Sequence, residues 1–429
     1  MQAFFKKSVA RLLKLEARLV LRKYKPRIVA VTGSVGKTST KDAIYAVVSK
    51  GVYARKSQKS FNSEIGLPLT VLGQPNAWRN PFRWIENLFD GLMLYVLPRR
   101  YPEWLVLEAG ADRPGDISSL SSWLPVDIAV ITRLPEVPVH VEYFDSPEAV
   151  KEEKASLIRA LKEGGSLVLY ADDKEVAGLR ERAATARVTT FGFHEDADVR
   201  AHDARVSLDE HGRPAGMVSQ ITMAGKTAEL VVKGALGAHA LLPALAAAGV
   251  GLAMGKGEGE ILESLKGYEP PHGRMHLIPG LKGTLIIDDT YNSSPAAVEA
   301  ALAALALVPG RKIAVLGDML ELGRHSVDEH RKAGAWAAKV ADALITVGFR
   351  ARDIAEGALD SGMRDSQILQ FEDAGPAGKE LELMLQAGDI ILIKGSQSMR
   401  MERMVEEIML NPEQAPHLLV RQDAEWKKR

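Results

Sequence analysis

Ten residues near the start of the chain, VTGSVGKTST at positions 31–40, have the residue types and spacing of a phosphate-binding loop. Gly33 and Gly36 would let backbone N–H groups wrap around a phosphate, because glycine has no side chain to obstruct them. Lys37 can neutralise the β- and γ-phosphates of a nucleotide, and the Thr38 hydroxyl can ligate Mg²⁺. Because Val31 stands where the general pattern has a glycine, the loop is a shortened variant. We predict that it binds ATP through Thr32, Gly33, Ser34, Val35, Gly36, Lys37, Thr38 and Ser39.

The elements around this loop indicate an α/β domain. A β-branched run at 27–33 precedes the loop, and a helix is predicted over 37–50. Further buried strands are predicted at 104–110, 126–132 and 166–172, with a helix over 147–161. Such alternation is typical of a mainly parallel sheet covered on both faces. Residues 188–232 predict a β-rich edge, and a helix is predicted over 238–254.

A second α/β series follows the segment EPPHGR at 269–274, whose prolines and glycine predict a hinge. Strands are predicted at 283–289, 312–318, 343–348 and 389–396, with helices over 295–307 and 327–340. We therefore predict three parts: a basic amphipathic helix at 1–26, a central P-loop ATPase domain at 27–272, and a smaller Rossmann-like α/β domain at 273–429.

The composition excludes several classes of protein. The 429 residues have a formal net charge of zero, which argues against a nucleic-acid binder. The absence of cysteine removes disulfides and thiolate sites, and it fits a cytoplasmic protein. No apolar run approaches the roughly 18 residues that span a bilayer.

Two segments leave alternatives open. Residues 1–27 hold nine basic residues against one acid, Glu16, with apolar positions at helical spacing. This helix is expected either to dock on the rest of the protein or to lie on the inner face of an anionic membrane. Residues 78–104 hold three of the six tryptophans. They resemble an insertion that forms a lid, a packing hairpin or a membrane-surface contact.

The shortened loop and six further motifs resemble, in order, the Mur ligases, and the further motifs favour the branch that adds D-alanyl-D-alanine. The shortened loop also resembles the folylpolyglutamate synthases. The other motifs are NSEIGLP at 62–68, LEAGADRPGDI at 107–117, HVEYFDS at 140–146 with the lysine at 154, DDTYNSSP at 288–295 with GDMLELG at 317–323, and KGSQS at 394–398. The resemblance covers nearly all of the chain after residue 27.

The resemblance implies a ligase that activates a carboxylate as an acyl phosphate. It assigns Mg²⁺ to Thr38, Glu108, His140 and Lys154, the lysine as a carbamate formed with CO₂, because a bare ammonium would repel the ion. Lys37, His140, Lys154 and Arg274 are the expected catalytic residues.

The resemblance also assigns substrate contacts. Asn62 is expected to position phosphate or substrate. In the second domain, Arg274 would face phosphate and Asp289 the ribose, with Tyr291 and Asn292 near adenine or ribose. Lys394 and Ser396 would hold the incoming amino acid or dipeptide.

Two departures from the family pattern stand out. The family usually has Gly-x-His-Asn-x-x-Asn before the hinge, whereas this chain keeps His239 but has Ala240 and Pro243 in place of the asparagines. Mur ligases of this branch also carry an N-terminal domain that grips UDP. Only 26 residues precede the strand of the phosphate loop, so that domain is expected to be missing.

We expect, then, a monomeric ligase that uses ATP and Mg²⁺ to join D-alanyl-D-alanine to a muramyl-tripeptide precursor. Two alternatives remain: a related amide ligase acting on another acid or polymer, such as a folate or polyglutamate ligase, and a nucleotide-binding scaffold without activity.

Overall fold

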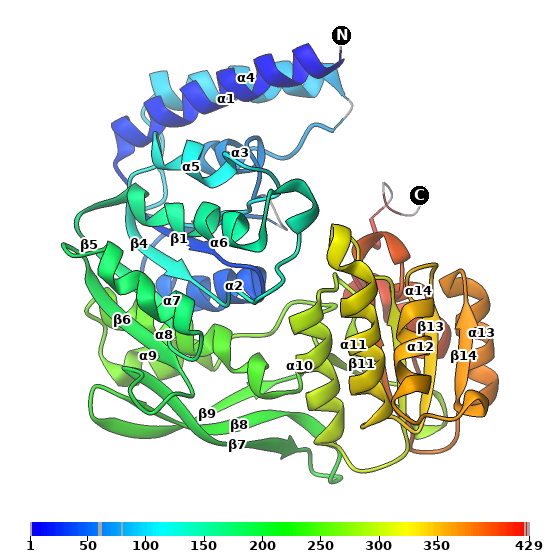
Figure 1. Ribbon diagram of the computed structural model, residues 1–429. Coiled ribbons are helices and arrows are strands. Elements are labelled where there is room, and N and C mark those ends of the chain that lie inside the picture. Colours follow the sequence, from blue (N-terminus) through cyan, green and yellow to red (C-terminus); the bar gives the residue numbers. More distant parts are fainter. Residues whose placement is uncertain (1, 59–61, 79, 424–425, 427–429) are drawn as a thin grey trace.

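The computed structural model describes residues 2–58, 62–78, 80–423 and 426 of the chain. Two α/β domains lie side by side, and a layer of helices from the N-terminal part of the chain covers the far end of the first domain (Figure 1). The predicted fold class, a P-loop domain with a mainly parallel sheet and a smaller α/β domain, is confirmed.

The first sheet has nine strands in the order β2-β3-β1-β4-β5-β6-β7-β8-β9. The pairs from β2 to β7 are parallel, whereas β8 and β9 are antiparallel additions. The β-rich edge predicted for 188–232 is therefore part of the same sheet. The bounds are β1 (Arg27–Thr32), β2 (Ala54–Lys56), β3 (Trp104–Glu108), β4 (Val126–Ile131), β5 (Leu161–Tyr170), β6 (Arg187–Gly192), β7 (Val199–Leu208), β8 (Pro214–Met223) and β9 (Lys226–Lys233).

Helices bury both faces of this sheet, which explains why its central strands read as continuous apolar runs. Val29 and Val31 of β1 pack in one core with α2 and α8, and Ile28 and Ala30 pack in the other core with α1 and α3. The helix bounds are α2 (Lys37–Val48), α3 (Gly66–Leu72), α5 (Asp116–Ser121), α6 (Pro147–Ala155), α7 (Lys174–Gly178), α8 (Leu242–Ala253) and α9 (Glu258–Leu265).

Two predicted helices are shorter than expected. The helix predicted over 147–161 ends at Ala155 and continues as a 3-10 helix, because β5 begins at Leu161. The helix predicted over 238–254 begins at Leu242 after a 3-10 turn. Pro243 fits the first turn of α8, where a missing N–H costs nothing.

The basic N-terminal segment forms one helix, α1 (Gln2–Tyr24), which packs against α3 and against α4 (Pro81–Val96). Leu13, Ala17 and Val20 are its most deeply buried side chains. The expectation that this helix docks on the rest of the protein is confirmed. None of the helices in the described part of the chain is long and apolar enough to cross a membrane.

The packing hairpin expected for residues 78–104 is wrong, because this stretch forms the single helix α4 and then enters β3. The expected lid stays a prediction. Asn80 caps the helix by accepting hydrogen bonds from Phe82 N and Arg83 N, and Pro81 occupies its first turn. Residue 79 lies outside the described residues. The two helices α1 and α4 lie side by side at the edge of the molecule (Figure 1).

The second sheet has six strands in the order β10-β11-β15-β12-β13-β14, with only β10 antiparallel among the described strands. Its helices lie on both faces, α10 to α12 on one and α13 and α14 on the other (Figure 1). The bounds are β10 (His276–Pro279), β11 (Leu285–Asp289), β12 (Lys312–Gly317), β13 (Ala343–Val347), β14 (Ile368–Phe371), β15 (Ile390–Lys394), α10 (Pro295–Ala306), α11 (Ser326–Ala338), α12 (Arg352–Asp360), α13 (Ala374–Met384), α14 (Glu402–Ile408) and α15 (Ala415–Leu418).

Candidate active site

The phosphate loop joins β1 to α2 at the carboxyl end of the first sheet. Gly33 has φ +142° and Gly36 has φ +83°, a region that side chains disfavour, and a Cβ on Gly33 would lie 1.9 Å from Thr132 Oγ1. The Thr132 hydroxyl, at the end of β4, donates to Val35 O at 2.8 Å. Thr132 therefore supports the loop from behind, a contact that no sequence motif indicated.

Lys37 begins α2 and folds back over the loop. Its Nζ donates to Gly33 O at 2.9 Å. Burial lowers the pKa of Lys37, and the negative charge of Glu108 opposes that shift. A phosphate bound on the loop would bring negative charge beside this amine and favour its charged form.

Glu108 lies at the end of β3, one strand away from the loop, and is 2% exposed. Its Oε1 accepts a long hydrogen bond from Asn62 Nδ2 at 3.4 Å, so these two predicted site residues lie together. Its Oε2 is buried and has no hydrogen-bond partner among the described residues. A buried carboxylate oxygen without a partner is costly, and a cation would satisfy it.

Lys154 lies on α6 and is 1% exposed. Burial, with a smaller contribution from the positive charge of Lys37, lowers the pKa of Lys154 to about 7. Much of this amine is therefore neutral near neutral pH. A neutral amine is the form that reacts with CO₂, so the environment suits the predicted carbamate.

His140 lies between two carboxylates that sequence reasoning missed. Its Nδ1 is 2.6 Å from Glu321 Oε2, and its Nε2 is 3.5 Å from Asp112 Oδ1. Glu321 belongs to the loop after β12, so the contact between His140 and Glu321 joins the two domains. The hydrogen bond from His140 is the largest of the effects that lower the pKa of Glu321.

The described residues contain no cluster of three or more His, Cys, Asp or Glu side chains that would hold a metal by themselves. The predicted set of Thr38, Glu108, His140 and Lys154 offers one carboxylate and one imidazole. Mg²⁺ commonly keeps waters and shares its ligands with substrate phosphates, so a sparse set of protein ligands is compatible with it.

Glu108→Gln should raise the Mg²⁺ concentration needed for half-maximal activity by at least about tenfold, because the amide cannot supply the charge of the buried oxygen. The measurement is a Mg²⁺ titration of phosphate release. Glu103→Gln is the matched control, because Glu103 is exposed just before the same strand. If the two variants show equal Mg²⁺ dependence, Glu108 is not a ligand.

The second domain meets the loop through Arg274. Its Nη2 donates to Thr38 Oγ1 at 3.1 Å, and its guanidinium lies 4.2 Å from the centroid of the Tyr291 ring. The predicted arginine, tyrosine and Mg²⁺-binding threonine thus lie together. Thr38 would have to exchange this contact for the metal.

Asp289 and Lys394 form a buried ion pair. Lys394 Nζ lies 2.6 Å from Asp289 Oδ2 and donates to Asn292 O at 2.8 Å. Lys394 is therefore already engaged, whereas sequence reasoning assigned it to the incoming amino acid. Ser396 lies nearby and its Oγ accepts from Leu320 N at 2.9 Å.

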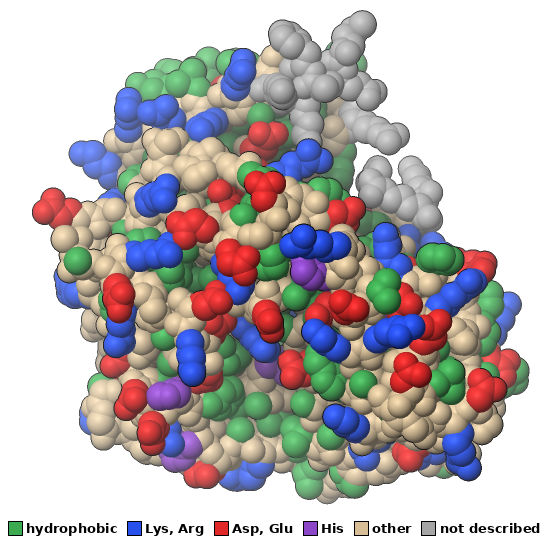
Figure 2. Space-filling model, viewed as in Figure 1, with side chains coloured by type: hydrophobic (Ala, Val, Ile, Leu, Met, Phe, Trp, Pro, Cys, Tyr) green, Lys and Arg blue, Asp and Glu red, His purple; other side chains and the backbone are tan. Residues whose placement is uncertain are grey.

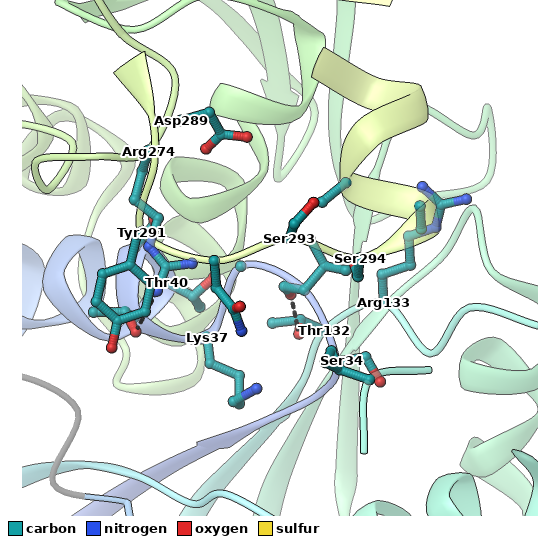
Figure 3. A pocket seen from close by; sticks show the side chains of 18 of the residues that line it. Ser34, Lys37, Thr40, Thr132, Arg133, Arg274, Asp289, Tyr291, Ser293 and Ser294 are labelled. Carbon is teal, nitrogen blue, oxygen red and sulfur yellow. Dashed lines mark hydrogen bonds between the residues drawn. The ribbon is translucent and has the colours of Figure 1, made fainter. Parts of the chain in front are cut away.

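A cavity of about 910 Å³ brings both domains together around the loop. Figure 3 shows the side chains of Lys37 and Thr132 from the first domain in one view with those of Arg274, Tyr291 and Asp289 from the second. Of the predicted loop residues, Ser34, Val35, Gly36, Lys37, Thr38 and Ser39 line this cavity, and Thr32 and Gly33 are not among its lining residues. Further lining residues, which the sequence did not single out, are Arg133, Ser293, Ser294, Glu321 and Asp112.

Ala240 and Pro243, the two departures from the family pattern, also line this cavity. The retained His239 is half-buried beside the Asp289–Lys394 pair. Burial lowers the pKa of His239 to about 4, so it is neutral at physiological pH. This part of the cavity therefore offers a ligand the apolar side chains of Ala240 and Pro243 and the neutral imidazole of His239.

A second cavity of about 1060 Å³ opens on the other side of Arg274 and Thr38. It is bounded by α1, α4, the hinge and the C-terminal segment. Charged side chains in its wall include Lys41, Lys56 and Arg421, and Trp78, Trp84 and Trp426 supply aromatic surface.

The chain is similar to known proteins over most of its length. Residues 91–251 match the Mur ligase middle domain, and residues 273–397 match the Mur ligase glutamate ligase domain. UDP-N-acetylmuramoyl-tripeptide–D-alanyl-D-alanine ligase of Bacillus subtilis is 33% identical over 92% of this chain and 79% of that protein. The enzyme of the same name from Escherichia coli is 28% identical over 90% of this chain and 77% of that protein.

Solved structures agree with this result. The MurF ligase of Thermotoga maritima in complex with ADP has a TM-score of 0.76 at 28% identity, covering 93% of this chain and 83% of that one. A MurF structure from Acinetobacter baumannii has a TM-score of 0.75 at 26% identity, covering 92% and 79%. The two domains, the phosphate loop and these similarities lead to one conclusion: the chain belongs to the Mur ligase family of ATP-dependent ligases.

Proposed function

We propose that this ligase adds D-alanyl-D-alanine to a muramyl-tripeptide precursor through an acyl-phosphate intermediate. The observation that carries the proposal is that one cavity is lined by the phosphate loop, Glu108 and the buried Lys154 on one side and by the Asp289–Lys394 pair of the second domain on the other. Glu108 Oε2 has no hydrogen-bond partner among the described residues. The names of the most similar relatives supply the substrate class.

ATP would lie with its phosphates on the loop of residues 32–39 and at the positive N-terminal end of α2. Lys37 and Arg274 would face the phosphates from opposite sides. Tyr291, Asn292 and Asp289 would contact the nucleoside, and Ala240 and Pro243 would pack against its base. One chain supplies both walls of the cavity, so we propose a monomer, working in the cytoplasm.

Mg²⁺ would be held by Thr38, Glu108, His140 and the carbamate of Lys154. Its contribution would be to offset negative charge on the phosphoryl oxygens. The donors fit this role, because Glu108 Oε2 lacks a partner among the described residues and Lys154 is held in a largely neutral form. For His140 to become a ligand, it would have to exchange its contact with Glu321.

Two displacements make up the reaction. A carboxylate oxygen of the acceptor attacks the γ-phosphorus of ATP, the bond to the β-phosphate oxygen breaks, and ADP leaves. The neutral amine of the dipeptide then attacks the acyl carbon, inorganic phosphate leaves, and the amine nitrogen loses a proton. Lys37 and Arg274 would stabilise the charge that develops on phosphoryl oxygens in the first step.

Asn62, Lys394 and Ser396 would position the substrates. Asn62 donates to Glu108 Oε1 and lines the same cavity as the loop. Because Asp289 neutralises Lys394, the pair would offer the dipeptide hydrogen bonds with little net charge.

The experiment is phosphate release with ATP and Mg²⁺ over a panel of acceptors and amines. We expect turnover with a muramyl-tripeptide and D-alanyl-D-alanine, at a rate well above that with glutamate or with either substrate alone. Faster turnover with a folate or polyglutamate acceptor would replace the proposed substrates. No ATP turnover with any pair would contradict the catalytic proposal.

A further inference from the structure

The outward face of α4 carries large apolar side chains in water. Phe82 is 79% exposed, Ile85 64%, Phe89 60%, Leu92 45% and Val96 58%. Their spacing of three and four residues places them on one side of the helix. The opposite side holds Trp84, Asn87, Gly91 and Leu94, which are buried. The helix is thus apolar on both its packed side and its free side.

The apolar surface continues onto α1, which is fixed against α4. Leu12 is 48% and Leu15 is 54% exposed. Lys23 Nζ donates to Leu94 O, Tyr95 O and Leu97 O at 3.1, 2.7 and 2.6 Å, and these are carbonyls at the end of α4. This contact caps α4 with a positive charge at its negative end. The two helices therefore present one surface, which we call the α1/α4 face: Leu12, Leu15, Phe82, Ile85, Phe89, Leu92 and Val96.

Exposed arginines border this face. Arg11, Arg18 and Arg22 lie on the same side of α1 as Leu15, and together with Leu15 they form a row with a spacing of three to four residues. Figure 2 shows apolar side chains along the upper edge of the molecule, over α1 and α4, with basic side chains among them.

Glu16, the acidic residue of α1, lies away from this border. It is turned into the seam between the helices, where Gly91 leaves it room. Its Oε2 is buried without a hydrogen-bond partner among the described residues. On α4, Glu86 adjoins the apolar stripe and Asp90 lies farther from it. The border of the α1/α4 face along α1 is therefore positive.

We infer that the α1/α4 face docks the protein on an anionic lipid surface, with both helices lying in the interface. The apolar side chains would enter the boundary of headgroups and acyl chains, and Arg11, Arg18 and Arg22 would meet lipid phosphates. Charge complementarity decides the partner. A second copy of the chain would bring the two rows of arginines towards each other, whereas an anionic membrane supplies the opposite charge.

The docking orientation brings the second cavity close to the lipid surface. Val9 of α1 and Pro81 and Trp84 of α4 line that cavity, directly beneath the face. The inference itself does not depend on which acceptor the enzyme uses.

The test is vesicle co-sedimentation of the full chain at physiological ionic strength. Vesicles of phosphatidylcholine with phosphatidylglycerol should bind the protein at least about tenfold more strongly than vesicles of phosphatidylcholine alone. The triple variant F82S/I85S/F89S should lose at least about tenfold in binding. The variant R11Q/R18Q/R22Q should lose the preference for anionic lipid.

The matched control is F349S/L383S, because Phe349 and Leu383 are 75% and 77% exposed but lie in the second domain. It should bind as the wild type does. All variants should keep wild-type ATP turnover without vesicles, since every substituted side chain is exposed. Absent binding by the wild type, or equal binding by F82S/I85S/F89S, would overturn the inference. A wild-type dimer in ultracentrifugation that becomes monomeric in F82S/I85S/F89S, without vesicle binding, would assign the face to a second copy instead.

Discussion

Lys37→Ala is expected to lower ATP turnover by at least about a thousandfold, roughly 4 kcal/mol of transition-state stabilisation. The loop backbone can donate N–H groups to a phosphate, but Lys37 alone in the loop carries a full positive charge. Its Nζ makes a single hydrogen bond among the described residues, to Gly33 O. The variant should therefore remain folded, because burial already opposes the charged form of this lysine.

The measurement is phosphate release under saturating ATP, Mg²⁺ and acceptor, with thermal unfolding to check the fold. Lys226→Ala is the control, because Lys226 is exposed on β9 and pairs with Glu258. It should keep wild-type activity. If Lys37→Ala retains turnover within tenfold of the wild type, about 1.4 kcal/mol, the phosphate loop does not act as proposed.

The phosphate loop and Glu108 could be predicted from the sequence, because each is marked by residues that are close together along the chain. The strand, the glycines, the lysine and the following helix are contiguous, and the carboxyl end of β3 follows from an apolar run that ends in Glu108. Parallel strands bring their carboxyl ends to one edge, so the loop, Glu108 and the segment around His140 were expected together.

The contacts between the domains could not be predicted in this way. His140 contacts Glu321, and Arg274 contacts Thr38, because the two α/β domains lie side by side. Lys394 was assigned to a substrate, but a partner 105 positions away, Asp289, already neutralises it. Nothing in either short motif specifies that pairing.

The helix α4 was missed although the sequence held its signals. Asn80 followed by Pro81 is a helix start, and Phe82, Ile85, Phe89, Leu92 and Val96 repeat at helical spacing. The tryptophans of residues 78–104 and their resemblance to an insertion led instead to the expectation of a lid or a hairpin. Apolar residues at helical spacing usually mark the side of a helix that faces the core. In α4 this row of residues is exposed, and the opposite side of the helix is buried.

Lys154→Ala is expected to lower ligase activity by at least about a hundredfold, and a short carboxylic acid such as acetate should restore part of it. The physical reason is the environment of this side chain, which is 1% exposed and whose pKa burial lowers to about 7. A carbamate there would carry negative charge towards the metal, and alanine would leave space for a small carboxylate in the same place.

Lys151→Ala is a matched control, because Lys151 lies three residues earlier on α6 and pairs with Glu175 at 2.8 Å. This variant should stay within about threefold of wild-type activity and should not respond to acetate. Wild-type protein equilibrated with carbon-13-labelled bicarbonate should show a carbamate resonance that Lys154→Ala lacks and Lys151→Ala retains. A hundredfold loss without rescue, together with no carbamate resonance in the wild type, would mean that Lys154 acts as an amine or ammonium. In that case the metal would have to take its second negative charge from Glu321 or Asp112, the two carboxylates that flank His140.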